Sequence, residues 1–226
     1  LQKFGISKDK LIVLGNALNP IFTSVLDLPV DEVLGLKKIA RSSLLDDLKL
    51  KYSLVASKEW KLVVFSTGRL NKVKGFQYLA AVAQDLPNNL FIILGGDDGY
   101  GKELQQLFAP INNVLFLDEF VSRKELAKMF RAADVFVLPS LHEPFGIVLI
   151  EAMSQGCAVI ASESPGPVTI TANGKFGSLV APADSYLLTK AVAALGDEGA
   201  QLTIQQAKSL RRAKDFTWGR ILREYT

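Results

Sequence analysis

Cysteine, histidine and tryptophan are scarce in this 226-residue sequence, which contains one Cys, one His and two Trp. The single cysteine, Cys157, cannot form an internal disulfide, which excludes a disulfide-dense scaffold and favours a reducing compartment. We therefore expect a cytoplasmic protein. One histidine and one cysteine are also too few for a transition-metal site.

Long apolar runs and an excess of one charge are missing as well. No uninterrupted apolar run reaches the roughly 18 residues of a membrane span, and no signal peptide is recognisable. The 26 Lys and Arg exceed the 23 Asp and Glu by three, and they are spread along the chain. This pattern indicates neither a nucleic-acid-binding stripe nor a polybasic membrane anchor. Since the chain begins at Leu1 and not at Met, we expect a piece of a longer protein.

The composition is that of an ordinary globular domain. Apolar residues make up 49% of the chain and charged residues 22%, which excludes a disordered or fibrous protein. A chain of this length is sufficient for one large α/β domain with a buried core.

Strand-like apolar runs alternate with helical patterns over most of the chain. Strands are predicted at residues 10–14, 61–65, 90–94, 114–117, 135–138 and 158–160. Helices are predicted at 43–52, 75–86, 102–108, 123–133, 147–155, 184–195, 199–216 and 217–225, while 25–35 shows no clear period. Such repeats build a doubly wound, Rossmann-like parallel sheet with helices on both faces, which binds ligands beyond the carboxyl ends of its strands.

A basic, glycine-bounded segment follows the predicted strand at 61–65. Its sequence is Gly68-Arg69-Leu70-Asn71-Lys72-Val73-Lys74-Gly75. Cations next to the free amides of a helix N-terminus are typical of pyrophosphate binding. A solvated basic turn is the alternative interpretation.

A second polar loop, His142-Glu143-Pro144-Phe145-Gly146, follows the strand at 135–138. Pro144 and Gly146 disfavour helix, so Glu143 should lie in the loop, and Glu151 about one turn inside the next helix. Two carboxylates beside the amides of residues 145–148 can accept hydroxyl hydrogen bonds from a sugar and a ribose. The alternative role of Glu151 is only a favourable interaction with the positive end of the helix dipole. His142 has no partner that would indicate acid–base catalysis.

Several common motifs are absent. The run Gly95-Gly96-Asp97-Asp98-Gly99-Tyr100-Gly101 lacks the third glycine of a dinucleotide fingerprint, because Leu104 stands there. There is no phosphate-binding G-x-x-x-x-G-K-[ST] loop and no G-x-S-x-G elbow. Ser164-Pro165-Gly166-Pro167 reads as a flexible loop at the same sheet edge, and Cys157 as inert core.

Taken in order, these loops resemble the C-terminal, donor-binding half of retaining glycosyltransferases of family 4 (group 1). Those enzymes have the two-domain GT-B architecture, and glycogen, starch and sucrose synthases are similar. The resemblance covers residues 62–182. It rests on Gly68-Arg69-Leu70 with Lys74-Gly75, Gly95-Gly96-Asp97, Phe120-Val121-Ser122 with Glu125-Leu126, Ala133-Asp134-Val135, Pro139-Ser140-x-x-Glu143-Pro144-Phe145-Gly146, Glu151-Ala152-Met153, Gly156 and Gly174-x-x-Gly177-x-Leu179-Val180.

The resemblance implies a role for each matching residue. Arg69 and Lys74 would bind the donor diphosphate and stabilise the charge on the leaving nucleoside diphosphate, which makes them catalytic together with Glu143. Glu143 would hold the transferred sugar, and Glu151 the ribose. The remaining implied contacts to a UDP-, GDP- or ADP-sugar are Gly68, Phe120, Val121, Phe145, Gly146 and Ile147. No metal or other cofactor is expected.

The resemblance also implies a domain organisation. Residues 1–226 would form the nucleotide-sugar domain, with 1–24 as an interdomain connection and 216–226 as a C-terminal return helix. An N-terminal domain, absent here, would hold a carbohydrate or lipid-linked acceptor. Peripheral membrane contact of the full-length protein stays open. The isolated fragment should therefore be inactive as a hexosyltransferase.

The sequence departs from the family pattern at three places. It also permits a function other than sugar transfer. Pro167-Val168-Thr169, Asn16-Ala17-Leu18 and Glu119 replace the residues usual in the family. A stand-alone nucleotide-sugar binding or regulatory module is the alternative function. An NAD-dependent enzyme is disfavoured by the incomplete glycine fingerprint.

Overall fold

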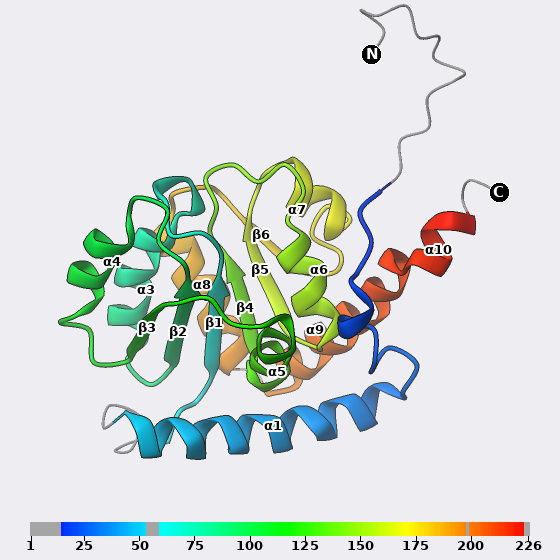
Figure 1. The fold of residues 1–226 in the computed structure, drawn as a ribbon, viewed down its shortest axis with the longest axis horizontal. Helices are drawn as coiled ribbons and strands as arrows, with labels where there is room; N and C mark the ends of the chain where they lie inside the picture. The colour runs from blue at the N-terminus through cyan, green and yellow to red at the C-terminus, as the bar shows by residue number, and fades with distance from the viewer. Residues whose placement is uncertain (1–14, 53–58, 198, 224–226) are drawn as a thin grey trace, which may run out of the picture.

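Six parallel strands form the sheet of the computed structural model, which describes residues 15–52, 59–197 and 199–223 (Figure 1). The strands are β1 (Val63–Thr67), β2 (Leu90–Gly95), β3 (Val114–Asp118), β4 (Val135–Leu138), β5 (Ala158–Ser162) and β6 (Ser178–Val180). Their order across the sheet is β3-β2-β1-β4-β5-β6, and every pairing is parallel. The predicted doubly wound parallel sheet is confirmed.

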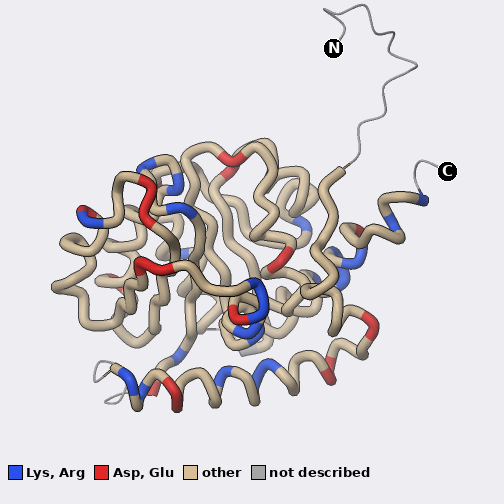
Figure 2. Tube along the Cα trace, viewed as in Figure 1, with Lys and Arg blue, Asp and Glu red and all other residues tan. Residues whose placement is uncertain are grey.

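Helices cover both faces of this sheet. The α-helices are α1 (Val30–Lys51), α3 (Leu79–Asp85), α4 (Gly101–Phe108), α5 (Arg123–Ala132), α6 (Ile147–Ser154), α7 (Pro165–Ile170), α8 (Ser185–Asp197), α9 (Gly199–Ala213) and α10 (Trp218–Arg223). Short 3₁₀ helices lie at η3 (Pro20–Phe22), η4 (Lys72–Lys74), η5 (Phe76–Tyr78) and η6 (Lys214–Phe216). Acidic and basic residues are interleaved along α1 and over the loops (Figure 2).

The buried side chains form two clusters, one on each face of the sheet. Val63 and Phe65 of β1 belong to the cluster with α5, α6 and α9, while Val64 belongs to the cluster with α3, α4 and α8. Since neighbouring residues of a strand point to opposite faces, a strand buried on both faces must be apolar throughout. That requirement explains the continuous apolar runs that predicted these strands.

Three phenylalanines fill the centre of the first cluster. The Phe65, Phe130 and Phe136 rings meet edge to face, with centroids 5.2–6.1 Å apart. Each such pair contributes about 1 kcal/mol beyond its burial. The packing of these rings joins α5 to β1 and β4 at the middle of the sheet.

The strand order defines where a ligand can approach. β1 pairs with β2 on one side and with β4 on the other. The chain therefore winds away from β1 in both directions, and the carboxyl edge beside β1 and β4 is the switch point at which sheets of this kind bind ligands in a crevice. The two polar loops singled out in the sequence are the loops that follow these two strands.

The helix predicted at 43–52 begins much earlier than expected. α1 starts at Val30, with Asp31 and Glu32 in its first turn, where they complement the helix dipole. Its apolar pattern is weak because Lys37 is buried among the residues that face the core. Residues 25–35 showed no clear period because they span the turn before α1 and only its first six residues.

Several local predictions are corrected as well. Ser164-Pro165-Gly166-Pro167 is not a flexible loop, because Pro165 occupies the first position of α7, where its fixed φ favours helix. The segment after β1 does not open an α-helix: it forms η4 and η5, and α3 begins only at Leu79. β6 was not predicted, and the strand predicted at 10–14 lies outside the described residues.

Candidate functional site

The loops after β1 and β4 are packed directly against each other. The Leu141 amide donates a 2.8 Å hydrogen bond to the Val73 carbonyl. Gly75 has a φ of 72°, and a Cβ there would overlap the Pro139 carbonyl. Only glycine accepts both this conformation and this approach. Gly75 therefore ends η4 and allows the basic segment to lie beside the Glu143 loop.

Lys74 and Glu143 meet where these two loops touch. The Nζ of Lys74 lies 2.6 Å from Oε2 of Glu143, and the two side chains are 20% and 10% exposed. The Asn71 side chain accepts a hydrogen bond from the Lys74 amide, which sets the turn that carries the lysine. A charged pair this poorly solvated is costly unless its remaining hydrogen-bonding capacity is used.

Arg69 and Lys72 lie farther from this pair. Nη1 of Arg69 is 3.2 Å from Oδ2 of Asp98, and its side chain is 70% exposed. The Lys72 ammonium lies over the Tyr100 ring, 5.3 Å from its centroid. Of the three cations of this segment, Lys74 is the one in contact with a predicted site residue, and Arg69 remains free to reorient in solvent.

The N-terminus of α6 follows β4 and also lies at the carboxyl edge of the sheet. The helix begins at Ile147 after Gly146, as the sequence predicted, so its first-turn amides lack intrahelical acceptors. Gly146 has a φ of 88°, and the Gly166 amide donates to the Glu143 carbonyl at 3.1 Å. Phe145 is partly buried against the core. The turn between β4 and α6 is therefore fixed from both sides.

Glu151 is buried on the second turn of α6. Its side chain is 2% exposed, and its Oε1 lies 2.9 Å from Nη1 of Arg123. Burial raises the pKa of Glu151, and the nearby Arg123 charge opposes that rise. A role confined to the helix dipole does not explain a carboxylate buried this deeply.

Arg123 is the site residue that the sequence analysis missed. It opens α5, one residue after Ser122, which forms a capping box with Glu125. The helix predicted at 123–133 placed the start of α5, but it could not indicate that α5 and α6 lie side by side. Only that packing brings Arg123 to Glu151.

Phe120 lies in the loop between β3 and α5 and is 86% exposed. Its ring covers Gly96, where a Cβ would overlap the ring atoms. Val121, the next residue, packs against the core cluster of the α5 face. Phe120, one of the two residues predicted to contact a base, thus presents an exposed aromatic ring beside Gly96.

The single histidine and the single cysteine are not part of the candidate site. His142 is exposed, and Cys157 is buried, with its Sγ 2.9 Å from the Phe130 carbonyl. Burial raises the pKa of the Cys157 thiol to about 11, which makes it inert, as predicted. Within the described residues, no three potential ligands are grouped to hold a metal ion. The helices described there are too short or too polar to cross a membrane.

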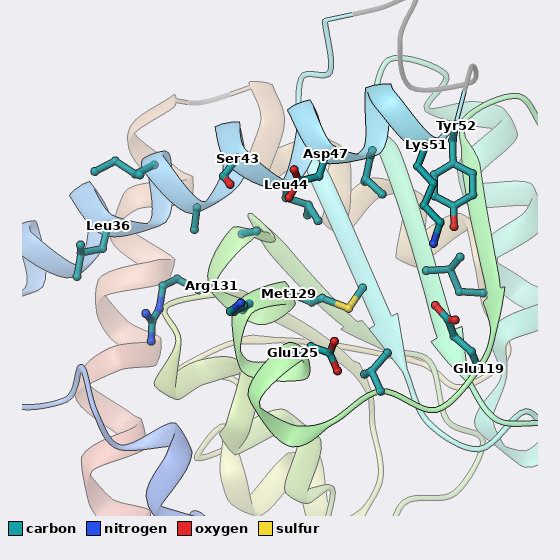
Figure 3. A pocket seen from close by; sticks show the side chains of 17 residues that line it. Leu36, Ser43, Leu44, Asp47, Lys51, Tyr52, Glu119, Glu125, Met129 and Arg131 are labelled. Atoms are coloured by element: carbon teal, nitrogen blue, oxygen red, sulfur yellow. The ribbon is translucent and has the colours of Figure 1, made fainter.

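A hollow of about 680 Å³ runs between α1 and α5 (Figure 3). Leu44, Met129 and Val121 are among its apolar walls, while Asp47 and Glu119 are among its charged lining residues. Of the predicted site residues, Val121 alone lines it, so the candidate site is placed at Lys74, Glu143 and Glu151 and not in this hollow.

Comparison with known proteins identifies the family. The family described as "Glycosyl transferases group 1" matches residues 54–213, which is most of the chain. The protein belongs to this family. An uncharacterized glycosyltransferase of Methanocaldococcus jannaschii is 28% identical over 98% of the chain and 54% of its own length. A D-inositol 3-phosphate glycosyltransferase of Mycobacterium ulcerans is 30% identical over 71% of the chain and 36% of its own length.

Solved glycosyltransferases share the fold. WaaG, a glycosyltransferase involved in lipopolysaccharide biosynthesis, aligns with a TM-score of 0.73 at 18% identity, over 98% of this chain and 56% of that one. HepE of Anabaena, solved with UDP-glucose, aligns with a TM-score of 0.68 at 26% identity, over 80% of this chain and 51% of that one. The fold is that of GT-B glycosyltransferases. The chain spans about half the length of these proteins or less.

Proposed function

We propose that this chain is the donor-binding domain of a retaining, family 4 glycosyltransferase that uses a nucleoside-diphosphate sugar. The observation that carries the proposal is that two buried carboxylates, Glu143 after β4 and Glu151 on α6, each pair with a basic residue of another element beside the switch point of the sheet. The UDP-glucose bound to the similar HepE supports a donor of this class.

In this proposal, different residues contact different parts of the donor. Lys74 and Arg69 meet the diphosphate, and their charges stabilise the negative charge that develops on the leaving group. Glu143 accepts hydrogen bonds from hydroxyls of the transferred hexose, and Glu151 from the ribose. Neutralisation of the diphosphate by these cations needs no metal ion in this proposal.

The remaining predicted contacts frame the donor. The amides at Phe145, Gly146 and Ile147 reach the sugar, the backbone at Phe120 and Val121 reaches the base, and Gly68 leaves room beside the diphosphate. The Lys74 ammonium has three donors and gives one to Glu143, so it can keep this contact while it meets the diphosphate.

The acceptor, in our proposal, is held by a second domain, and transfer takes place in the cleft between the two. Residues 15–24 lie beside the end of the chain, where the Leu18 amide donates to the Phe216 carbonyl at 2.8 Å. That contact supports residues 1–24 as the connection and 216–226 as the return helix. The isolated chain should accordingly bind the donor in the cytoplasm but transfer little sugar.

Calorimetric titration of UDP, GDP, ADP and their glucose conjugates tests the donor site. We expect one nucleotide series to bind. Glu151→Ala should weaken the nucleotide and its glucose conjugate about tenfold or more, and Glu143→Gln should weaken the glucose conjugate, since each variant loses charge-assisted hydrogen bonds. Glu103→Ala is the matched control, because Glu103 is exposed on α4. Absence of binding by all of these nucleotides would overturn the proposal. Efficient transfer to an acceptor by this chain alone would remove the need for a second domain.

A further inference from the structure

Arg123 and Glu151 differ sharply in their exposure to solvent. The guanidinium side chain is 59% exposed, while the carboxylate side chain that it contacts is 2% exposed. A buried carboxylate loses much of its hydration and favours its neutral, protonated form. A protonated Glu151 would present one donor and lose part of its capacity to accept hydroxyl hydrogen bonds.

The contact between them uses only one carboxylate oxygen. Nη1 of Arg123 donates to Oε1 of Glu151 at 2.9 Å. In the described parts of the chain, no other hydrogen bond reaches this carboxylate, so Oε2 has no partner within the protein. The geometry is therefore that of a counter-ion on one oxygen of a buried carboxylate and an unused acceptor on the other.

We propose that Arg123 is a positioning residue that holds Glu151 in its charged form with Oε2 open to the donor ribose. This inference rests on the proposed function, because it concerns the same donor site. Arg123 acts through Glu151 and does not itself need to touch the ribose.

Other charged groups around Glu151 do not supply the same effect. The elements packed against α6 include α5, α7, α9, β4 and β5. α7, β4 and β5 contain no ionisable residue. The charged residues on α9 are Lys208, Arg211 and Arg212, the others on α5 are Lys124, Glu125, Lys128 and Arg131, and the loop before α6 carries His142 and Glu143. Among all of these, Arg123 is the group that opposes the rise in the pKa of Glu151.

Three of the nearby charged groups already have partners elsewhere. Arg131 donates to the side-chain oxygen of Gln155, and Arg212 donates to the Ile170 carbonyl and to Asp215. Glu143 is paired with Lys74. A change at Arg123 should therefore not be compensated by a neighbouring cation.

The test follows nucleotide affinity as a function of pH. UDP, GDP and ADP are titrated into the wild-type chain between pH 5 and pH 8, and the tightest binder is kept for all variants. In Arg123→Gln we expect the acidic loss of affinity to move to higher pH by about one unit, because a nearby opposite charge lowers a carboxyl pKa by about that much or more. Titration of the nucleotide phosphate is common to all variants and cancels in the comparison.

Two further variants keep this test specific. Arg123→Lys should retain the wild-type pH profile, since an ammonium supplies the same charge. Lys124→Gln, which removes the adjacent exposed cation of α5, should leave the profile unchanged. Thermal unfolding of each variant checks that it is folded.

Other outcomes would overturn the inference. An unshifted profile in folded Arg123→Gln, an equal shift in Lys124→Gln, or tighter binding in Arg123→Gln, which would mean that Arg123 blocks the ribose site, each contradicts it. These results presuppose that a nucleotide binds to the wild-type chain. A wild-type chain that binds none of the three nucleotides would instead reject the proposed function.

Discussion

The two edges of the sheet both bury charge, but they do so in different ways. At the amino edge, the ammonium of Lys37 on α1 lies within 3.4 Å of the carbonyls of Phe130 and Arg131 and 2.6 Å from that of Ala133, at the end of α5. All three of its donors are used. At the carboxyl edge, Glu143 and Glu151 each contact one cation through one oxygen.

This difference separates a structural charge from a functional one. Lys37 satisfies carbonyls that α5 leaves without intrahelical partners, so its burial stabilises the junction of α1 with α5. The Arg41–Asp134 pair continues this arrangement, because Oδ2 of Asp134 accepts from both the Arg41 guanidinium and the Val63 amide. Glu143 and Glu151 each accept from a single cation and from no backbone amide of the described residues, so they keep more accepting capacity for a ligand.

The largest effect on stability is expected at the amino edge. Lys37→Met removes the ammonium and leaves buried carbonyls unpaired, so we expect a loss of about 3 kcal/mol. For a chain of this size, the melting temperature should fall by about 6–12 °C. Nucleotide affinity should not change. Lys38→Met, which alters the neighbouring exposed lysine, is the control, and an unchanged melting temperature in Lys37→Met would contradict the assignment.

The next largest effect is expected on diphosphate binding at the carboxyl edge. Lys74→Ala and Arg69→Ala should each weaken nucleoside diphosphate about tenfold to a hundredfold and nucleoside far less, because only the former carries the charge they meet. Added salt should weaken wild-type binding of the diphosphate. Lys72→Ala removes a cation from the same turn and is the internal control. Affinity for nucleoside diphosphate is measured by calorimetry. Equal losses of this affinity in all three variants would mean that the segment is only a solvated basic turn.

A smaller effect of opposite sign on stability is expected for Glu151→Gln. Burial raises the pKa of Glu151, so the folded protein is destabilised when this carboxylate ionises. The neutral amide should therefore raise stability near pH 7 by about 1 kcal/mol, or 2–4 °C in melting temperature. The gain should vanish as the pH falls below the ordinary range of a glutamate. Thermal unfolding at both pH values measures this, and a gain that persists at low pH would argue against ionisation as its cause.

The smallest effect concerns Phe120. Because its side chain is exposed, Phe120→Ala should change stability by less than about 0.5 kcal/mol. If the ring stacks on the base, nucleoside affinity should fall about fivefold, which corresponds to roughly 1 kcal/mol. Leu50→Ala, which truncates another exposed apolar side chain far along α1, should not alter affinity. Identical nucleoside binding by the Phe120→Ala and wild-type chains would remove the ring from the site.

The sequence predicted most of the sheet because the strands are simple in physical terms. Strands such as β4, buried on both faces, must be continuously apolar, so their residues identify them without knowledge of their neighbours. The same reasoning failed at α1, where Lys37 replaces an apolar residue on the buried face, and at α7, which begins at Pro165 within a stretch that resembles a loop.

What the sequence by itself determined is the order of strands and helices, and hence the parallel sheet and the edge at which its polar loops gather. Those properties follow from local periodicity and from the handedness of strand–helix–strand crossovers. Only the tertiary structure decided which charges meet. Lys74 and Glu143 are 69 residues apart, and Arg123 and Glu151 are 28 apart. Such pairs depend on how two loops or two helices pack. No local pattern in the chain indicates which residues so far apart in the sequence come into contact.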